Sequence, residues 1–291
     1  MAMPEVTQDE VIERSSTLPG FPLVVTRILA TLDDPEANTE MLAGHIQHDP
    51  AIAARVLSLA NTAATRTRRL SAIHDIFTAT SLLGLNRVRQ LATISGIGGF
   101  VDEFAPAEMP VTFWQHSVAV GVCSEELALN TAAPASASTA LIAGLLHDIG
   151  ELWLYRFNPE AFRAAWGEAI ARDIGIEQAE REFFGADHAC IGAWLAGHWQ
   201  LPPDIVAAIR GHHAPDAALD EPLVPLVHVA EVLSNGLDLA SRDENRVTSI
   251  SAAACRALGL NWDESARPLF GRMEARSRHA NAFFQTTAPA T

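Results

Sequence analysis

The fold class predicted for this sequence is all-α, and three observations support the prediction. Apolar residues recur at helical spacing along most of the chain, beginning with residues 22–32 and 39–47. No segment alternates apolar and polar residues over the length of a strand; the one candidate, "PLVVT", is short and begins with proline. Apolar residues make up 48% of the chain, as in folded globular proteins, yet no apolar run approaches the roughly 20 residues of a membrane-spanning helix.

The first half of the chain is expected to form five helices. The start of the third is well marked, because Asp49 is a candidate N-cap and Pro50 suits the first helical position. Gly84 is expected to separate the fourth helix from the fifth. The expected helices cover residues 22–32, 39–47, 50–63, 73–83 and 85–97.

Proline and acidic residues interrupt the helical pattern at residues 102–110, which indicates a boundary. The expected organisation is a tail (1–16), an N-terminal helical half (17–105), a second helical half (106–240) and a C-terminal helical extension (241–291). Beyond the boundary, the expected helices cover residues 111–131, 138–147, 159–173, 187–199, 203–212, 222–240, 251–260 and 264–284.

Charge and cysteine content restrict the possible functions. The chain has 20 basic and 35 acidic residues, a net charge of −15, and every basic residue is arginine. Without lysine, a Walker-type phosphate loop and a Schiff-base mechanism are excluded, and the anionic surface disfavours direct nucleic-acid binding. The stretch "TRTRR" (65–69) is typical of a solvated loop, with docking of a phosphate or acidic surface as the alternative. Three distant cysteines and a polar, acidic N-terminus indicate a reduced, cytoplasmic protein away from membranes.

Histidines beside carboxylates are the main candidates for chemistry. His147 and Asp148 end the apolar run of "LIAGLLHDIGELW", and Gly150 is expected to cap that helix at its C-terminus. The helix dipole there favours a cation, and imidazole and carboxylate are ligands for Fe, Mn, Zn or Ni. Further candidates are His116, His188, His212, His213 and Glu231, with His228 three residues before Glu231 on the same helical face.

Each candidate also has a structural reading. His116 fits a hydrogen-bonded core histidine, His188 a capping or packing residue, and His213 a solvent-exposed residue. The other histidines and three tryptophans have no expected function. His45, His48, His74 and His279 are assigned to packing or to the surface, and Trp153, Trp194 and Trp199 are assigned to the core.

Taken as an ordered set, these residues resemble the metal site of the HD superfamily of phosphohydrolases. The chain is most similar to the HDOD branch of bacterial signalling proteins. This resemblance rests first on "LPGFPLVVTRILATLDDPEANTEMLAGHIQHDPAIAARVLSLANTA" and "LSAIHDIFTATSLLGLNRVRQLATISGI". It continues through "LIAGLLHDIGEL", "GADHACIGAWLAGHWQLPPDIVAAIRGHHAP" and "VPLVHVAEVLS", covering roughly residues 17–240.

The resemblance implies a dinuclear site, carried over from the related HD-GYP phosphodiesterases. In those enzymes one ion is held by the first histidine, the HD pair and a late aspartate. A second ion is held by three more histidines. The HD aspartate bridges the two ions. In this sequence the corresponding residues are His116, His147, Asp148 and Glu231 for the first ion, and His188, His212 and His213 for the second. One or two divalent ions (Fe, Mn, Ni or Zn) are therefore the expected cofactors.

Departures from that pattern disfavour catalysis. The enzymes continue as HDIGK, with a lysine that contacts substrate phosphate, whereas this chain has Glu151. An acidic residue four positions before the first histidine is Thr112 here, no GYP segment follows the histidine pair, and Glu231 replaces the late aspartate. The resulting expectation is a non-catalytic signalling module that binds other signalling proteins. The alternative is a metal-dependent phosphohydrolase, with Arg210 steadying substrate charge.

Overall fold

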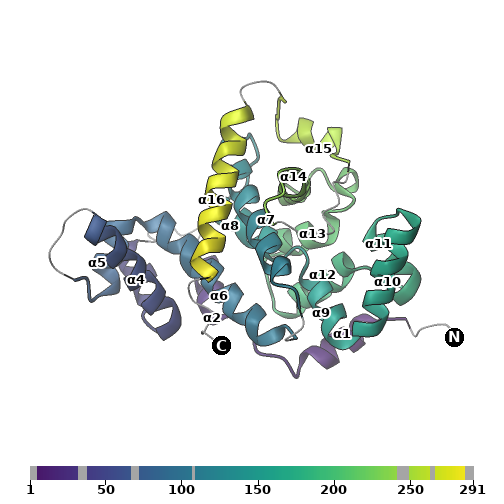
Figure 1. The fold of residues 1–291 in the computed structure, drawn as a ribbon, viewed down its shortest axis with the longest axis horizontal. Coiled ribbons are helices and arrows are strands. Elements are labelled where there is room, and N and C mark those ends of the chain that lie inside the picture. The colour runs from purple at the N-terminus through teal and green to yellow at the C-terminus, as the bar shows by residue number, and fades with distance from the viewer. Residues whose placement is uncertain are drawn as a thin grey trace. The chain divides into compact units, whose positions relative to one another are not determined.

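The computed structural model describes residues 5–31, 38–66, 72–106, 109–240, 249–262 and 266–285. Within these residues the regular structure is helical and contains no strand, which confirms the all-α prediction (Figure 1). The chain divides into two compact units. The small unit comprises residues 20–102, and the large unit comprises residues 1–19 and 103–291. The four-part organisation expected from the sequence stays a prediction.

In the small unit, side chains cap the starts of three helices: Asn38, Asp49 and Asp75 accept hydrogen bonds from backbone N–H groups of the first turn. The Asp49 carboxylate accepts hydrogen bonds from the backbone N–H groups of Ala51 and Ile52, which confirms the helix start predicted there. Gly84, with φ of 88°, separates two helices as predicted. The helices are α2 (Leu23–Ala30), α3 (Thr39–Ile46), α4 (Pro50–Arg66), α5 (Ile76–Leu83) and α6 (Leu85–Phe104), the last extending just past the unit. Residues 67–69 of "TRTRR" lie outside the described residues.

The large unit is centred on α7 (Val111–Asn130), which packs along α8 (Ala137–Leu146). Two later helices, α14 (Leu223–Gly236) and α16 (Arg267–Gln285), pack on α7, and α12 (His188–His198) packs on α9 (Ile149–Phe157) and α13 (Pro203–Gly211) (Figure 1). The remaining elements are α1 (Gln8–Ser15), α10 (Pro159–Arg172), α11 (Ile176–Phe184), the short 3₁₀ helix η1 (Pro215–Ala217) and α15 (Ala252–Ala257).

Three short helices, α1, α9 and α11, were not expected from the sequence, and the role predicted for Gly150 is wrong. Gly150 is the second residue of α9 rather than the C-cap of α8, which ends at Leu146 with His147 as its C-cap. A Cβ on Gly150 would lie 2.0 Å from the carbonyl oxygen of His188. Glycine is therefore required here because α9 and α12 approach closely.

The burial of the tryptophans and of the histidines outside the site agrees in part with the prediction. Trp153 is fully buried, whereas Trp194 and Trp199 are half-buried. The histidines assigned to surface or packing roles agree with their positions: His45 is half-buried, and His48, His74 and His279 are exposed. Among the described residues, no helix combines the length and the apolar character needed to cross a bilayer.

Candidate metal centre

The HD pair lies at the junction of two helices. His147 is the C-cap of α8 and Asp148 is the N-cap of α9, so each charge type lies at the helix end that favours it. The Nδ1–H of His147 donates to the carbonyl oxygen of Gly144 at 2.8 Å. That bond leaves Nε2 of His147 without a proton in the neutral ring, 3.1 Å from Asp148 Oδ2. The Asp148 carboxylate makes no capping hydrogen bond and instead faces the histidines.

Asp148 is the centre of the cluster. Its Oδ2 atom lies 3.5 Å from Nε2 of His116 on α7, in addition to its contact with His147. Its Oδ1 atom lies 3.5 Å from Nε2 of His188 and 3.7 Å from Nε2 of His212. Two histidines thus approach each carboxylate oxygen, which is the arrangement a bridging carboxylate needs.

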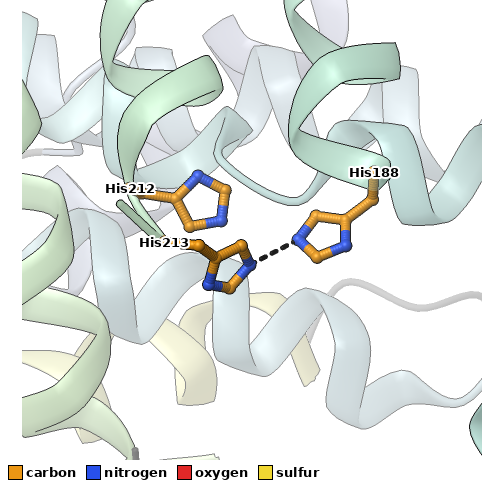
Figure 2. A group of neighbouring side chains, drawn as sticks. All are labelled: His188, His212 and His213. Carbon is orange, nitrogen blue, oxygen red and sulfur yellow. Dashed lines mark hydrogen bonds between the residues drawn. The ribbon is translucent and has the colours of Figure 1, made fainter. Parts of the chain in front are cut away.

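The other candidate ligands form a group on either side of Asp148. On one side, ligand atoms of His188, His212 and His213 lie within 4.8 Å of one another (Figure 2). The Nε2 atoms of His213 and His188 are 2.7 Å apart (Figure 2). On the other side, His116 and His147 form an equivalent group with Glu231 of α14. The structure therefore brings together all seven residues singled out from the sequence.

Glu151, treated in the sequence as a departure from the enzymes, belongs to the same cluster. One of its carboxylate oxygens forms a third group with Asp148 and His188, again within 4.8 Å. Its side chain lies in the first turn of α9 and is 5% exposed. An additional buried carboxylate therefore lies beside the bridging position.

Glu180 contacts the cluster through His188, and the sequence analysis missed it. Its Oε2 atom accepts two hydrogen bonds from His188, one from the backbone N–H at 2.8 Å and one from Nδ1–H at 2.6 Å. These bonds turn Nε2 of His188 toward Asp148, as carboxylates commonly do behind metal-binding histidines. A signal was present in the sequence: Glu180 falls among the buried positions of α11, next to Ala179 and on the face of Phe184.

A backbone carbonyl orients His212 in the same way. The Nδ1–H of His212 donates to the carbonyl oxygen of Ile209 at 2.7 Å. The His212 carbonyl in turn accepts from Nδ1–H of His228 at 2.8 Å, while Nε2 of His228 accepts from the backbone N–H of Ser251 at 3.0 Å. His228 therefore links the histidine pair to the segment that precedes α15.

The electrostatics fit a site for cations. Burial alone would raise the pKa of Asp148, but His147, His188 and His116 hold it well below its usual range, so Asp148 is a carboxylate. Burial lowers the pKa of His212 well below its usual value, and the neighbouring His147 lowers it further. His212 is therefore a neutral imidazole, the form that coordinates metals.

His188 shows the opposite shift. Burial opposes its protonation, but the carboxylate of Glu180, followed by those of Asp148 and Glu151, raises its pKa well above the usual value. Burial raises the pKa of Glu180. The buried carboxylates thus draw positive charge into the cluster, whether it is carried by a proton or by a metal ion.

Arg210 does not join this cluster. It is exposed, and its Nη1 lies 3.5 Å from Sγ of Cys190. Thr112, by contrast, lines a pocket next to the cluster together with Glu151.

Comparison with known proteins identifies the family. The HDOD domain family model matches residues 18–215, which include six of the seven candidate ligands and leave Glu231 beyond the match. An uncharacterised protein of Treponema pallidum is 26% identical over 230 residues, 78% of this chain. The chain spans 44% of the length of that curated relative.

Solved structures share the fold. An HDOD domain protein of unknown function from Geobacter sulfurreducens superposes with a TM-score of 0.73 at 24% identity, covering 96% of this chain and 98% of the other. A Shewanella amazonensis protein, named provisionally as a phosphohydrolase, gives 0.69 at 24% identity, with coverage of 94% and 97%. A Marinobacter aquaeolei protein, named provisionally as a signal transduction protein, gives 0.72 at 22% identity, with coverage of 94% and 60%. With the family model matching most of its length, this chain belongs to the HDOD domain family.

Proposed function

We propose that this chain is a regulatory HDOD protein whose large unit holds one or two divalent metal ions and which acts through contacts with other signalling proteins. The observation that carries the proposal is the grouping of six buried or half-buried ligand residues around Asp148, the seventh.

The donor set fits such ions. Imidazole nitrogens and carboxylate oxygens suit Fe, Mn, Ni or Zn, and the cluster contains no thiolate among its described members. One ion would be held by His116, His147 and Glu231, and a second by His188, His212 and His213, with Asp148 between them. Bound ions of this kind stabilise the fold that presents their ligands, and in hydrolases they also polarise phosphoryl groups.

Two features argue against turnover of a phosphate ester. Glu151 places a buried carboxylate in the cluster, where it repels an anionic substrate. The arginine considered for substrate binding, Arg210, contacts Cys190 and is exposed. Without lysine in the chain, the positive charge needed to bind a phosphate would have to come from the metal ions or from an arginine such as Arg163, which lines the neighbouring pocket.

The small unit is the part proposed to contact partner proteins. It lacks the ligand residues of the metal cluster, which all come from α7 to α14 of the large unit. Two large apolar side chains of the small unit, Leu23 and Phe77, are exposed by more than half of their surface. Contiguous apolar patches mark protein–protein interfaces, and we propose that these two side chains belong to such a patch.

A second candidate function is metal-dependent phosphohydrolysis, favoured by the completeness of the ligand set. In that case the protein would hydrolyse a phosphomonoester or phosphodiester, and activity would depend on the added metal. Activity absent from a fully metal-loaded protein would leave the regulatory function as the better account.

Elemental analysis of protein purified without chelators tests the metal site directly. We expect about one or two Fe, Mn, Ni or Zn ions per chain, and loss of stoichiometric metal in the double variant His147→Ala, Asp148→Ala. His45→Ala is the matched control, because His45 lies in the small unit and should leave the metal content unchanged. A metal content well below one ion per chain that does not rise after reconstitution would contradict the proposed site. Capture of signalling proteins by wild type and by the double variant then tests whether partner binding requires the metal.

A further inference from the structure

A pocket of about 480 Å³ lies beside the metal cluster, between the start of α7, α9 and α10. Its volume lies within the range of small-molecule binding sites. Glu151 contributes to the pocket lining as well as to the cluster. The pocket therefore reaches the edge of the metal site but is formed mainly by other residues.

Aromatic side chains make up much of the lining: Phe113, Tyr155, Phe162 and Trp166. Tyr155 and Phe162 pack edge to face with ring centroids 5.8 Å apart, and Phe162 and Trp166 do so at 6.4 Å. The faces of aromatic rings carry partial negative charge and attract organic cations placed above them. Such a lining holds alkylated ammonium groups better than it holds anions.

The fixed charge in the pocket has the same preference. The Glu151 carboxylate is almost fully buried, so water screens it poorly and a cation nearby is favoured. Arg163 also lines the pocket, but it is exposed and its charge is therefore screened by solvent. The net charge of −15 adds a long-range attraction for cations.

From these observations we infer that the pocket binds a small organic cation, with an alkylated ammonium group against the aromatic rings and Glu151 as its counter-charge. This site goes beyond the proposed function and does not require a metal ion. It gives a regulatory protein a small-molecule input next to its metal cluster.

Calorimetric titration of the full chain with choline and with its uncharged analogue 3,3-dimethylbutan-1-ol tests the inference. We expect choline to bind and the uncharged analogue to bind at least about tenfold more weakly. Glu151→Gln should weaken choline binding by roughly tenfold or more, whereas Glu160→Gln, an exposed carboxylate on α10 outside the lining, should not. Trp166→Leu should weaken choline but not the uncharged analogue, with Trp262→Leu as the aromatic control outside the pocket.

Equal binding of the two compounds, or no binding of choline, overturns the inference. Failure of this inference is distinguishable from failure of the metal proposal, because Trp166 is not a candidate ligand. Trp166→Leu should therefore keep the metal content of wild type while losing choline. Protein that binds choline but no metal refutes the metal site alone, and protein that binds metal but no choline refutes the pocket alone.

Discussion

Replacing Glu180 by Gln changes a residue that touches the candidate metal centre only through His188. Glu180 has 0% of its surface exposed, and its Oε2 accepts both the backbone N–H and the Nδ1–H of His188. Glutamine keeps the shape of the side chain but offers one carbonyl oxygen and an amide group that only donates. Both donors face the same oxygen, so the glutamine carbonyl can accept both bonds, but it carries no charge to hold the imidazole. Its amide group takes the place of Oε1, which is buried without a hydrogen-bond partner among the described residues.

The expected magnitude follows from these bonds. A hydrogen bond to a charged group contributes about 1.5–3 kcal/mol, and the neutral side chain costs less to bury, so we expect the free energy of unfolding to fall by about 2 kcal/mol. For a folded unit of about 150–250 residues, such as the large unit, a loss of about 2 kcal/mol in stability corresponds to a decrease in Tm of about 4–8 °C. Because His188 is also less well oriented, affinity for a divalent ion should fall about 10–100-fold.

Thermal denaturation followed by circular dichroism, in the presence of chelator, measures the first effect. Competition with a chromophoric chelator for Mn²⁺ or Zn²⁺ measures the second. Glu182→Gln is the matched control, because Glu182 lies on the same helix and pairs with Arg172 at the surface. If Glu180→Gln matched Glu182→Gln in both assays, the role assigned to Glu180 would be refuted. A lower Tm with unchanged metal affinity would show instead that His188 is not a ligand.

Three further predictions concern packing, ion pairing and pH. Gly150→Ala places a Cβ about where the His188 carbonyl lies and should lower stability by about 1–3 kcal/mol in urea denaturation, with weaker metal binding because α9 shifts against α12. Arg276→Ala should cost about 1–2 kcal/mol by the same measurement, because it removes the guanidinium that pairs with Glu125 and Glu126 of α7 and leaves Arg272 as the remaining α16 partner of Glu126. Hydrogen bonds from backbone N–H groups at the start of α5 lower the pKa of Asp75. The stabilising effect of its charge is therefore present above the unfolded pKa of 3.8 and is lost as the pH falls below it. The difference in stability between wild type and Asp75→Ala should accordingly become smaller below that pH.

Each of these predictions has its own contradicting result. A Gly150→Ala protein as stable as wild type would mean that α9 and α12 are further apart than described. The control is Arg278→Ala, because the Arg278 guanidinium is exposed and pairs within its own helix. Equal losses of stability in the two variants would show that Arg276 does not stabilise the packing of α16 on α7. A stability difference for Asp75→Ala that stayed constant from neutral to acid pH would show that the charge of Asp75 plays no part in the cap.

Local sequence signals accounted for much of the fold. Helical periodicity and the caps at Asp49 and Gly84 predicted element boundaries that the structure confirms, because these signals act within a few residues. The helices α1, α9 and α11 are only eight or nine residues long. Length alone does not explain why they were missed, because α2, α3 and α5 are equally short and were expected. The sequences of α1 and α11 are rich in charged residues, and α9 follows α8 after only two residues and contains a glycine that was interpreted as a cap.

The candidate site was predictable to a different extent. Its ligand residues were selected as an ordered motif, and the structure brings those residues together. The role of Glu180 beside His188 and the requirement for glycine at position 150 could not be predicted from the motif. Both depend on contacts with α12, which is distant in sequence. Glu151 was placed correctly next to the HD pair, but its position at the edge of an aromatic pocket follows only from the packing of α7, α9 and α10.

The orientation of the histidines bears on what a metal ion would do in this protein. His147, His188 and His212 each use Nδ1 for a hydrogen bond to a carbonyl or carboxylate, and each turns Nε2 toward Asp148. These bonds are made by the fold itself, so the ligands are oriented before any ion binds and little further ordering is required. Metal binding would then add stability mainly by holding α7, α8, α12, α13 and α14 together. A cluster with that property can serve regulation without turnover, because occupancy of the site changes the free energy needed to separate the helices that carry it.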